Sequence, residues 1–198
     1  MHFSNDEFFR MVKAWLAISV AFGIILFDGF DFGPKFVKVL VIAGVTVGVG
    51  FILHELAHKF VAQKFGLYAE FHSFDIMLVG MLIMAYFFRF LIAVPGAVFI
   101  QGKVTVKRNG IISAVGPLMN IFLAIVFFAL FSFMQGSQFS DVFLYGFTIN
   151  SWLAVFNLIP FFNLDGTKIL AWNKVVYFAM VVFAFVLMAI SDYVRVKV

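Results

Sequence analysis

Residues 39–58 read VLVIAGVTVGVGFILHELAH, an uncharged apolar run that ends in His54, Glu55 and His58. On a helix, residues four apart share one face and lie about 6 Å apart along the axis. Two imidazoles so placed can bind one Zn²⁺, and the carboxylate between them can reach a water beside the metal. Ionisable side chains in a membrane helix are costly and usually functional. The pattern therefore predicts a catalytic zinc ion bound by His54 and His58, with Glu55 as general base; the alternative is a cluster of headgroup-facing polar residues at a helix end.

The overall composition is that of an integral membrane protein. Of the 198 residues, 64% are hydrophobic and 12% are charged, against about 45–50% and 25% in soluble domains. We interpret the formal charge of +4 as contact with anionic lipid headgroups, and we expect no nucleic-acid partner. The absence of cysteine excludes thiolate ligands, so a metal site must use histidine and carboxylate side chains.

Five apolar segments approach or reach the roughly 20 residues that a helix needs to cross the hydrocarbon layer. They are Met11–Phe27, Phe36–Gln63, Ile111–Met134, Val142–Phe162 and Ile169–Ile190. We therefore expect an all-α polytopic membrane protein with about five transmembrane helices, forming a single domain over residues 1–198. Basic residues after the last span suggest a truncated sixth helix, because they lie on the side where such residues are disfavoured.

The stretch Leu67–Asn109 has a different pattern. Its apolar run Ile76–Ile100 is interrupted by Arg89 and by a proline. Ala97–Val106 has β-branched residues on both sides of a glycine-containing turn, which predicts a short hairpin. We interpret the whole stretch as a re-entrant or interfacial segment with some β-structure, and one further membrane span is the alternative.

The distribution of basic residues predicts the orientation of the chain. Three groups lie next to spans: Lys59 and Lys64; Lys103, Lys107 and Arg108; and Lys168 and Lys174. The positive-inside rule places these groups in the cytoplasm if Leu67–Asn109 does not cross the membrane. We therefore expect a multi-pass protein of the cell membrane, with a cytoplasmic N-terminus and the zinc site toward the cytoplasmic side.

A catalytic zinc ion needs a third protein ligand and an open position for water. The candidates are His72, Asp75, Asp141, Asp165 and Asp192. The predicted topology puts Asp141 and Asp192 on the opposite side of the membrane from His58. Asp165 ends the fourth predicted span on the matching side, so we select it as the third ligand and keep His72 as the second choice.

Three separated elements make the chain resemble the site-2 proteases, a family of intramembrane zinc metalloproteases. The first is His54–His58. The second is Gly116-Pro117-Leu118-Met119-Asn120, similar to the family's Gly-x-x-x-Asn element, and the third is Asn157-Leu158-Ile159-Pro160 followed by Asn163-Leu164-Asp165-Gly166, similar to its Asn-x-x-Pro and Asp-Gly elements. Many members have proline at the position of Leu164. The resemblance is strongest to an archaeal member with little beyond the catalytic core, here about residues 36–166.

The resemblance implies that His54, His58 and Asp165 bind zinc and that Glu55 is the general base. It also implies a three-helix core made of the second, third and fourth spans, and substrates that are membrane-anchored proteins. Asn157 matches an asparagine that helps to hold the substrate or the developing oxyanion.

Some roles remain alternatives at this level. Asn120 either bonds across to a neighbouring helix as a packing residue or acts directly beside the site. We expect a structural role for Asn150 and a turn at Gly166. Ala97–Val106 is a hypothetical edge to which an unwound substrate adds as a strand. The alternatives to a protease are a metal-ion transporter, which would also place ionisable groups in the membrane, and a non-catalytic adaptor in which zinc ties helices together.

Overall fold

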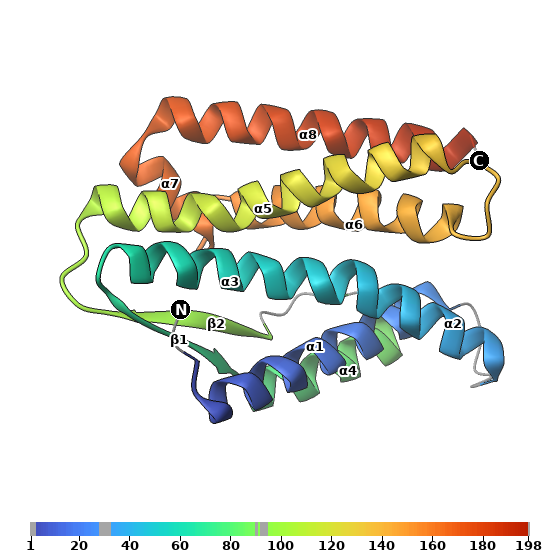
Figure 1. Ribbon diagram of the computed structural model, residues 1–198, viewed down its shortest axis with the longest axis horizontal. Helices are drawn as coiled ribbons and strands as arrows, with labels where there is room; N and C mark the ends of the chain where they lie inside the picture. Colours follow the sequence, from blue (N-terminus) through green and yellow to red (C-terminus); the bar gives the residue numbers. More distant parts are fainter. Residues whose placement is uncertain (1–2, 28–32, 90, 92–94, 198) are drawn as a thin grey trace.

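The computed structural model describes residues 3–27, 33–89, 91 and 95–197 as helices lying along one long axis, with a small sheet at one end (Figure 1). The first helix, α1 (Asn5–Leu26), begins six residues before the predicted span because Ser4 caps it, accepting a hydrogen bond from the Glu7 backbone N–H at 3.1 Å. The all-α expectation with a small β-element is confirmed.

The second predicted span is one continuous helical segment with a widened turn in its middle. It consists of α2 (Pro34–Ala43), the π-helical segment η1 (Gly44–Gly48) and α3 (Val49–Lys64). A π-helical turn displaces backbone carbonyls from their usual partners, and the indole N–H of Trp15 donates to the Gly44 carbonyl at 3.0 Å. Helix α1 thereby supports the helix that carries the histidines.

The stretch after α3 returns to the end of the bundle from which it started (Figure 1). It contains strand β1 (Tyr68–Ser73), helix α4 (Asp75–Phe88) and strand β2 (Gly96–Gln101). With 14 residues, α4 is shorter than a membrane span requires. The predicted local hairpin is wrong: β2 pairs antiparallel with β1, across α4, and Val98 lies opposite Phe71. The strand-forming residues were recognised, but their partner is distant in the sequence.

The remaining helices form the other half of the molecule. They are α5 (Val106–Phe133), α6 (Ser140–Leu158), α7 (Asp165–Trp172) and α8 (Lys174–Lys197). The predicted span Ile169–Ile190 is wrong in its bounds, because the chain is extended at Asn173. The Asn173 side chain accepts hydrogen bonds from the backbone N–H groups of Val175 and Val176 at 2.9 and 3.1 Å, and thereby starts α8 as a separate helix.

Four of the described helical segments are long and apolar enough to cross a membrane: α1, the segment from α2 to α3, α5 and α8. Helix α6, the fourth predicted span, is present but carries buried polar residues such as Asn150 and Ser151. It packs against α5, α7 and α8, and Asn150 and Ser151 bond to carbonyls of the same helix. One apolar core joins α1, α3, α4 and β1, and another joins α5 to α8.

Candidate active site

Two helices bring the predicted metal ligands together. His54 and His58 lie one turn apart on α3, and their Nε2 atoms are 3.0 Å from each other. Proline 160 follows the end of α6, and α7 then begins at Asp165. The Oδ2 atom of Asp165 lies 3.3 Å from His54 Nε2 and 3.0 Å from His58 Nε2. All three side chains are buried.

Hydrogen bonds at the other ring nitrogens decide which atoms face the centre. His58 Nδ1 lies 2.7 Å from the Ile112 carbonyl oxygen, which can only accept, so Nδ1 carries the proton. His54 Nδ1 lies 2.6 Å from Oδ1 of Asn120. The amide of Asn120 is oriented by its Nδ2 atom, which donates to the Gly50 carbonyl at 3.3 Å. Nδ1 therefore carries a proton in both rings, so that in a neutral imidazole, the form that binds a metal, the lone pair is on Nε2 and faces Asp165.

This donor set fits a zinc ion. A tetrahedral site with bonds of about 2.0–2.2 Å separates its donor atoms by about 3.3–3.6 Å, close to the spacings of 3.0–3.3 Å found here. Within the described part of the chain, His54, His58 and Asp165 are the one group of three or more such residues that could hold a metal ion. Burial tends to raise the pKa of Asp165, but imidazoles that carry a proton toward it when no metal is bound outweigh burial and hold that pKa well below its usual range. The carboxyl group is therefore an anion.

Glu55 lies beside the three donors and is also buried. Its Oε2 atom accepts a hydrogen bond from the Val98 backbone N–H at 3.0 Å. In an antiparallel sheet, residues of a non-hydrogen-bonded pair direct their N–H groups outward. The N–H of Phe71, opposite Val98, accordingly points to the other side and donates to Glu7 Oε1 at 2.9 Å. Glu55 therefore faces the outer edge of β2.

Two glycines allow the backbone to lie close to neighbouring groups of the site. A Cβ on Gly116 of α5 would lie 2.3 Å from His58 Nε2 and 2.6 Å from His54 Cε1. A Cβ on Gly166 would lie 2.2 Å from the Leu158 carbonyl oxygen. Gly166 is in the first turn of α7 and its φ is not positive, so the predicted turn role is wrong and close packing is the reason for glycine.

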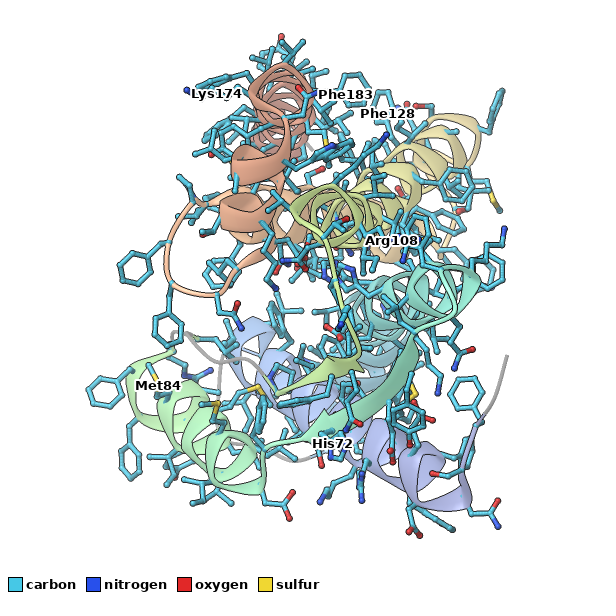
Figure 2. The ribbon with its side chains drawn as sticks, turned by 90° about the vertical axis from the view of Figure 1, so that its left-hand side faces the viewer. His72, Met84, Arg108, Phe128, Lys174 and Phe183 are labelled. Atoms are coloured by element: carbon cyan, nitrogen blue, oxygen red, sulfur yellow. The ribbon has the colours of Figure 1, made fainter. Side chains whose placement is uncertain are left out.

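The other predicted residues differ in their relation to the site. Asn120 contacts both His54 and the backbone of a neighbouring helix. It therefore lies beside the site and also bonds across helices, as the two alternatives for this residue predicted. Asn157 donates to the Leu153 carbonyl of its own helix at 2.9 Å and lies outside the three-residue group. His72 lies on β1 at the periphery (Figure 2), where its Nδ1 atom is 3.1 Å from Arg10 Nη1. It is not part of the metal-binding group.

Two further polar contacts surround these residues, of which the first agrees with the structural role expected for Asn150 and the second was not predicted. Asn150 on α6 accepts a hydrogen bond from Asn120 Nδ2 at 3.1 Å. Lys59, next to His58, forms a fully buried ion pair with Glu7. A polar residue within an apolar helix was a usable signal for Asn150, whereas nothing local linked Glu7 to Lys59.

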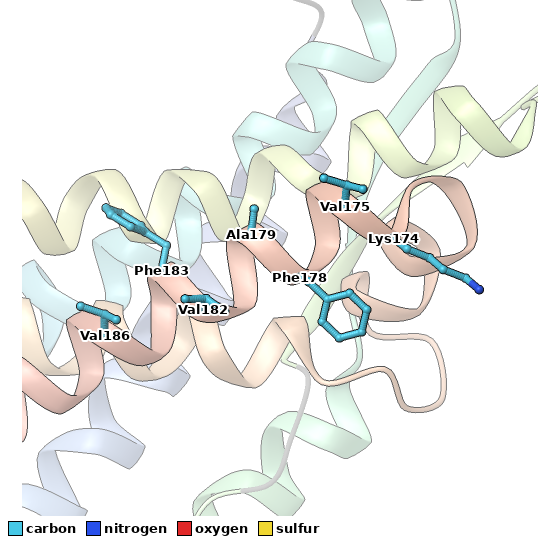
Figure 3. Close-up of a pocket in the computed structure, with 7 residues that line it drawn as sticks. All are labelled: Lys174, Val175, Phe178, Ala179, Val182, Phe183 and Val186. Atoms are coloured by element: carbon cyan, nitrogen blue, oxygen red, sulfur yellow. The ribbon is translucent and has the colours of Figure 1, made fainter.

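A hollow on the surface lies away from these residues. It is a shallow apolar depression along α8 (Figure 3), lined by Lys174, Val175, Phe178, Ala179, Val182, Phe183 and Val186. Helix α8 packs against α5, α6 and α7. An outward apolar face of this kind suits contact with lipid, and it has no group suited to hydrolysis.

Comparison with known proteins identifies two relatives, both from the archaeon Methanocaldococcus jannaschii. The protein MJ0611, whose name gives it as a candidate zinc metalloprotease, is 37% identical over 179 residues, which cover 88% of each chain. The zinc metalloprotease MJ0392 is 30% identical over 133 residues, which cover 64% of this chain and 32% of that protein.

No protein-family model and no solved structure matches the chain. The extent of the similarity to MJ0611 shows the family, and the buried His54, His58 and Asp165 form a group that could hold the zinc ion that both relatives' names imply. The chain therefore belongs to the zinc metalloproteases of the site-2 protease-like family and is a zinc metalloendopeptidase.

Proposed function

We propose that this enzyme hydrolyses peptide bonds of membrane-anchored proteins within or at the edge of the bilayer. In this proposal His54, His58 and Asp165 bind the zinc ion and Glu55 is the general base. The observation that carries it is the convergence of three lone-pair donors at 3.0–3.3 Å, beside a carboxylate that is not part of the group. Four helices of membrane-spanning length support a substrate in the bilayer.

Each side chain has a definite task in this chemistry. A bound zinc ion supplies a Lewis acid that makes water more acidic and polarises the scissile carbonyl. Glu55 accepts the proton from the attacking water and later donates it to the leaving amine. The hydrogen bonds at Nδ1 of His54 and His58 keep their Nε2 atoms directed at the centre, as is usual for metal-binding histidines.

We also propose that the site opens toward the cytoplasm. The sheet, the C-terminal end of α3 and the start of α5 all lie at one end of the bundle (Figure 1). The basic residues Lys59, Lys64, Lys107 and Arg108 belong to these helix ends. The positive-inside rule then places this end in the cytoplasm, where water can reach the zinc site.

The outer edge of β2 is the proposed binding position for the unwound substrate. An extended peptide that adds to this edge would accept a hydrogen bond from the Val98 N–H, which now donates to Glu55. Substrate binding would therefore release the Glu55 carboxylate at the moment when a peptide bond arrives beside it. Binding of the substrate and release of the Glu55 carboxylate from Val98 would then occur in the same step.

Substitutions of Glu55 test both parts of this proposal. We expect Glu55→Gln and Glu55→Ala to retain about one zinc per chain, measured by metal analysis, and to lose cleavage of a tagged membrane substrate. They should differ in binding an uncleaved peptide, because the glutamine oxygen can still accept from Val98 whereas alanine leaves this N–H free. A net hydrogen bond of about 1–1.5 kcal/mol corresponds to roughly tenfold tighter binding to Glu55→Ala.

The matched control is Glu70→Gln, because Glu70 is a partly exposed carboxylate on β1 that contacts Arg10 and should affect neither readout. Persistent cleavage by Glu55→Ala would rule out Glu55 as the base. Equal peptide binding by the two Glu55 variants would rule out strand addition at Val98 and leave the hydrolytic role intact. A metal-ion transporter or a zinc-tied adaptor would be little affected by either substitution.

A further inference from the structure

Asn150 is a fully buried amide in the middle of α6, two turns before the end of the helix. Its Nδ2 atom donates to the Gly146 carbonyl of the same helix at 2.9 Å. Its Oδ1 atom accepts from Asn120 Nδ2 at 3.1 Å. Because the Gly146 carbonyl can only accept, the amide of Asn150 has one orientation, with its oxygen directed at Asn120.

The next amide in this chain of hydrogen bonds is thereby also oriented. Asn120 Nδ2 has two hydrogens, one for Asn150 Oδ1 and one for the Gly50 carbonyl. Its Oδ1 atom is left to face His54 Nδ1 at 2.6 Å. The polarity therefore runs in one direction from α6 through α5 to α3, and it requires the proton of His54 to be on Nδ1.

The packing of α3 keeps this arrangement closed. A Cβ on Gly50 would lie 2.4 Å from Asn150 Oδ1, so the backbone of α3 rests directly against the amide. Asn120 and Asn150 are both 0% exposed, so bulk water does not reach these bonds. Each amide must find its partners within the protein.

We propose that Asn150 is a positioning residue for zinc binding, acting through Asn120 to hold His54 in the tautomer whose Nε2 atom carries the lone pair. This inference rests on the proposed role of His54 as a ligand. Without an acceptor at position 150, one N–H of Asn120 has no partner. The Gly50 carbonyl alone then holds the amide with its oxygen toward His54. The imidazole can then adopt the other tautomer, which presents a proton to the metal.

The test replaces Asn150 and measures zinc affinity by competition with a chelator. Loss of such an outer partner typically weakens metal binding 10–100-fold, and we expect this for Asn150→Leu, which is similar in size but offers no acceptor. Asn150→Asp keeps an oxygen facing Asn120 when its carboxyl group is protonated and donates its O–H to the Gly146 carbonyl, and it should then recover affinity to within about threefold of the native protein. Ser151→Ala is the matched control, since Ser151 is equally buried but bonds only to the Phe147 carbonyl of its own helix.

Nitrogen-15 labelling of histidine gives a second readout that is independent of cleavage. The chain has only four histidines, so the His54 signals can be assigned by substitution. In zinc-free protein we expect the Nδ1–H tautomer for native His54 and a mixture of both tautomers in Asn150→Leu. If this variant does not fold, Asn150→Ala carries the same expectations.

Two outcomes separate the inference from the proposed function. Unchanged zinc affinity and an unchanged tautomer in Asn150→Leu, with zinc binding lost in His54→Ala, would overturn the role of Asn150 and leave His54 as a ligand. Zinc binding that survives His54→Ala would overturn the proposed metal site and this inference together.

Discussion

Two buried polar clusters lie next to each other on α3. They differ in whether a cationic side chain balances the anionic one. Lys59 donates to both carboxylate oxygens of Glu7, and both residues are 1% exposed. The Phe71 N–H adds a further bond to Glu7, and the Phe3 ring lies 4.0 Å from the ammonium group. His58 is the residue before Lys59. Its Nε2 atom faces Nε2 of His54 and the Asp165 carboxylate.

The difference between the clusters distinguishes structure from function. Glu7 and Lys59 provide one anion and one cation, so the pair is complete with the atoms of the chain itself. With neutral imidazoles, His54, His58 and Asp165 direct electron pairs at one point, which is unfavourable unless a proton or a metal ion lies there. A cluster that needs a group from outside the chain is the one expected to bind a ligand. The predictions below test this contrast, beginning with the largest effect on activity.

Removal of a proposed metal ligand should have the largest effect. We expect Asp165→Ala to reduce bound zinc from about one per chain to a trace, because two imidazoles alone leave the site incomplete. Cleavage should fall to background, a larger loss than the 10–100-fold that outer partners cost. Metal analysis and a substrate-cleavage assay on the same preparation measure the two effects.

Asp141→Ala is the control for this prediction, because Asp141 is an exposed residue in the first turn of α6, at the other end of the bundle (Figure 1). It should retain zinc and activity. Full zinc occupancy in Asp165→Ala would show that the third donor is a different group.

The convergence of His54, His58 and Asp165 could be predicted from the sequence because its signals are local or depend on helix order. His54 and His58 are one helical turn apart, and Asp165 follows a span that the predicted topology ends on the same side of the membrane. The pairing of β2 with β1 could not be predicted in this way, because its partner Tyr68–Ser73 lies beyond an intervening helix. The ion pair of Glu7 and Lys59 joins residues 52 positions apart, and neither residue carries a local mark of its partner.

The start of α8 is an intermediate case. Only Asn173 and Lys174 interrupt the apolar residues here, so the prediction joined α7 and α8 into one span. The capping hydrogen bonds of Asn173 are typical of a helix start, and that local signal was available. Apolar composition identified the membrane helices better than it identified their ends.

Gly116→Ala should reduce activity without removing a ligand. The added Cβ would lie 2.3 Å from His58 Nε2, so the imidazoles must shift by a substantial fraction of an ångström. Misplacement of about 1 Å in a catalytic group can cost on the order of 100-fold, and we expect kcat to fall by about that factor while zinc remains detectable.

The control for Gly116 is Gly80→Ala in α4, where an added Cβ meets nothing within 4 Å. Activity should be unchanged there, and the helix should gain up to about 1 kcal/mol of stability from the better helix former. Native kcat in Gly116→Ala would mean that α5 can move away from the histidines at no cost to the site.

Glu7→Ala should have the smallest effect on the chemistry and a large effect on stability. It leaves Lys59 buried without its carboxylate, a change that typically costs about 3–5 kcal/mol, measurable by equilibrium unfolding in detergent. The protein that remains folded should keep its zinc and its kcat, because the ion pair provides no metal ligand. In the double variant Glu7→Leu with Lys59→Met, no charge remains to be compensated, so most of the lost stability should return. If Glu7→Ala instead loses zinc while still folded, the two clusters are coupled through Lys59 and His58. The balance of charge within each cluster then does not distinguish a structural cluster from a functional one.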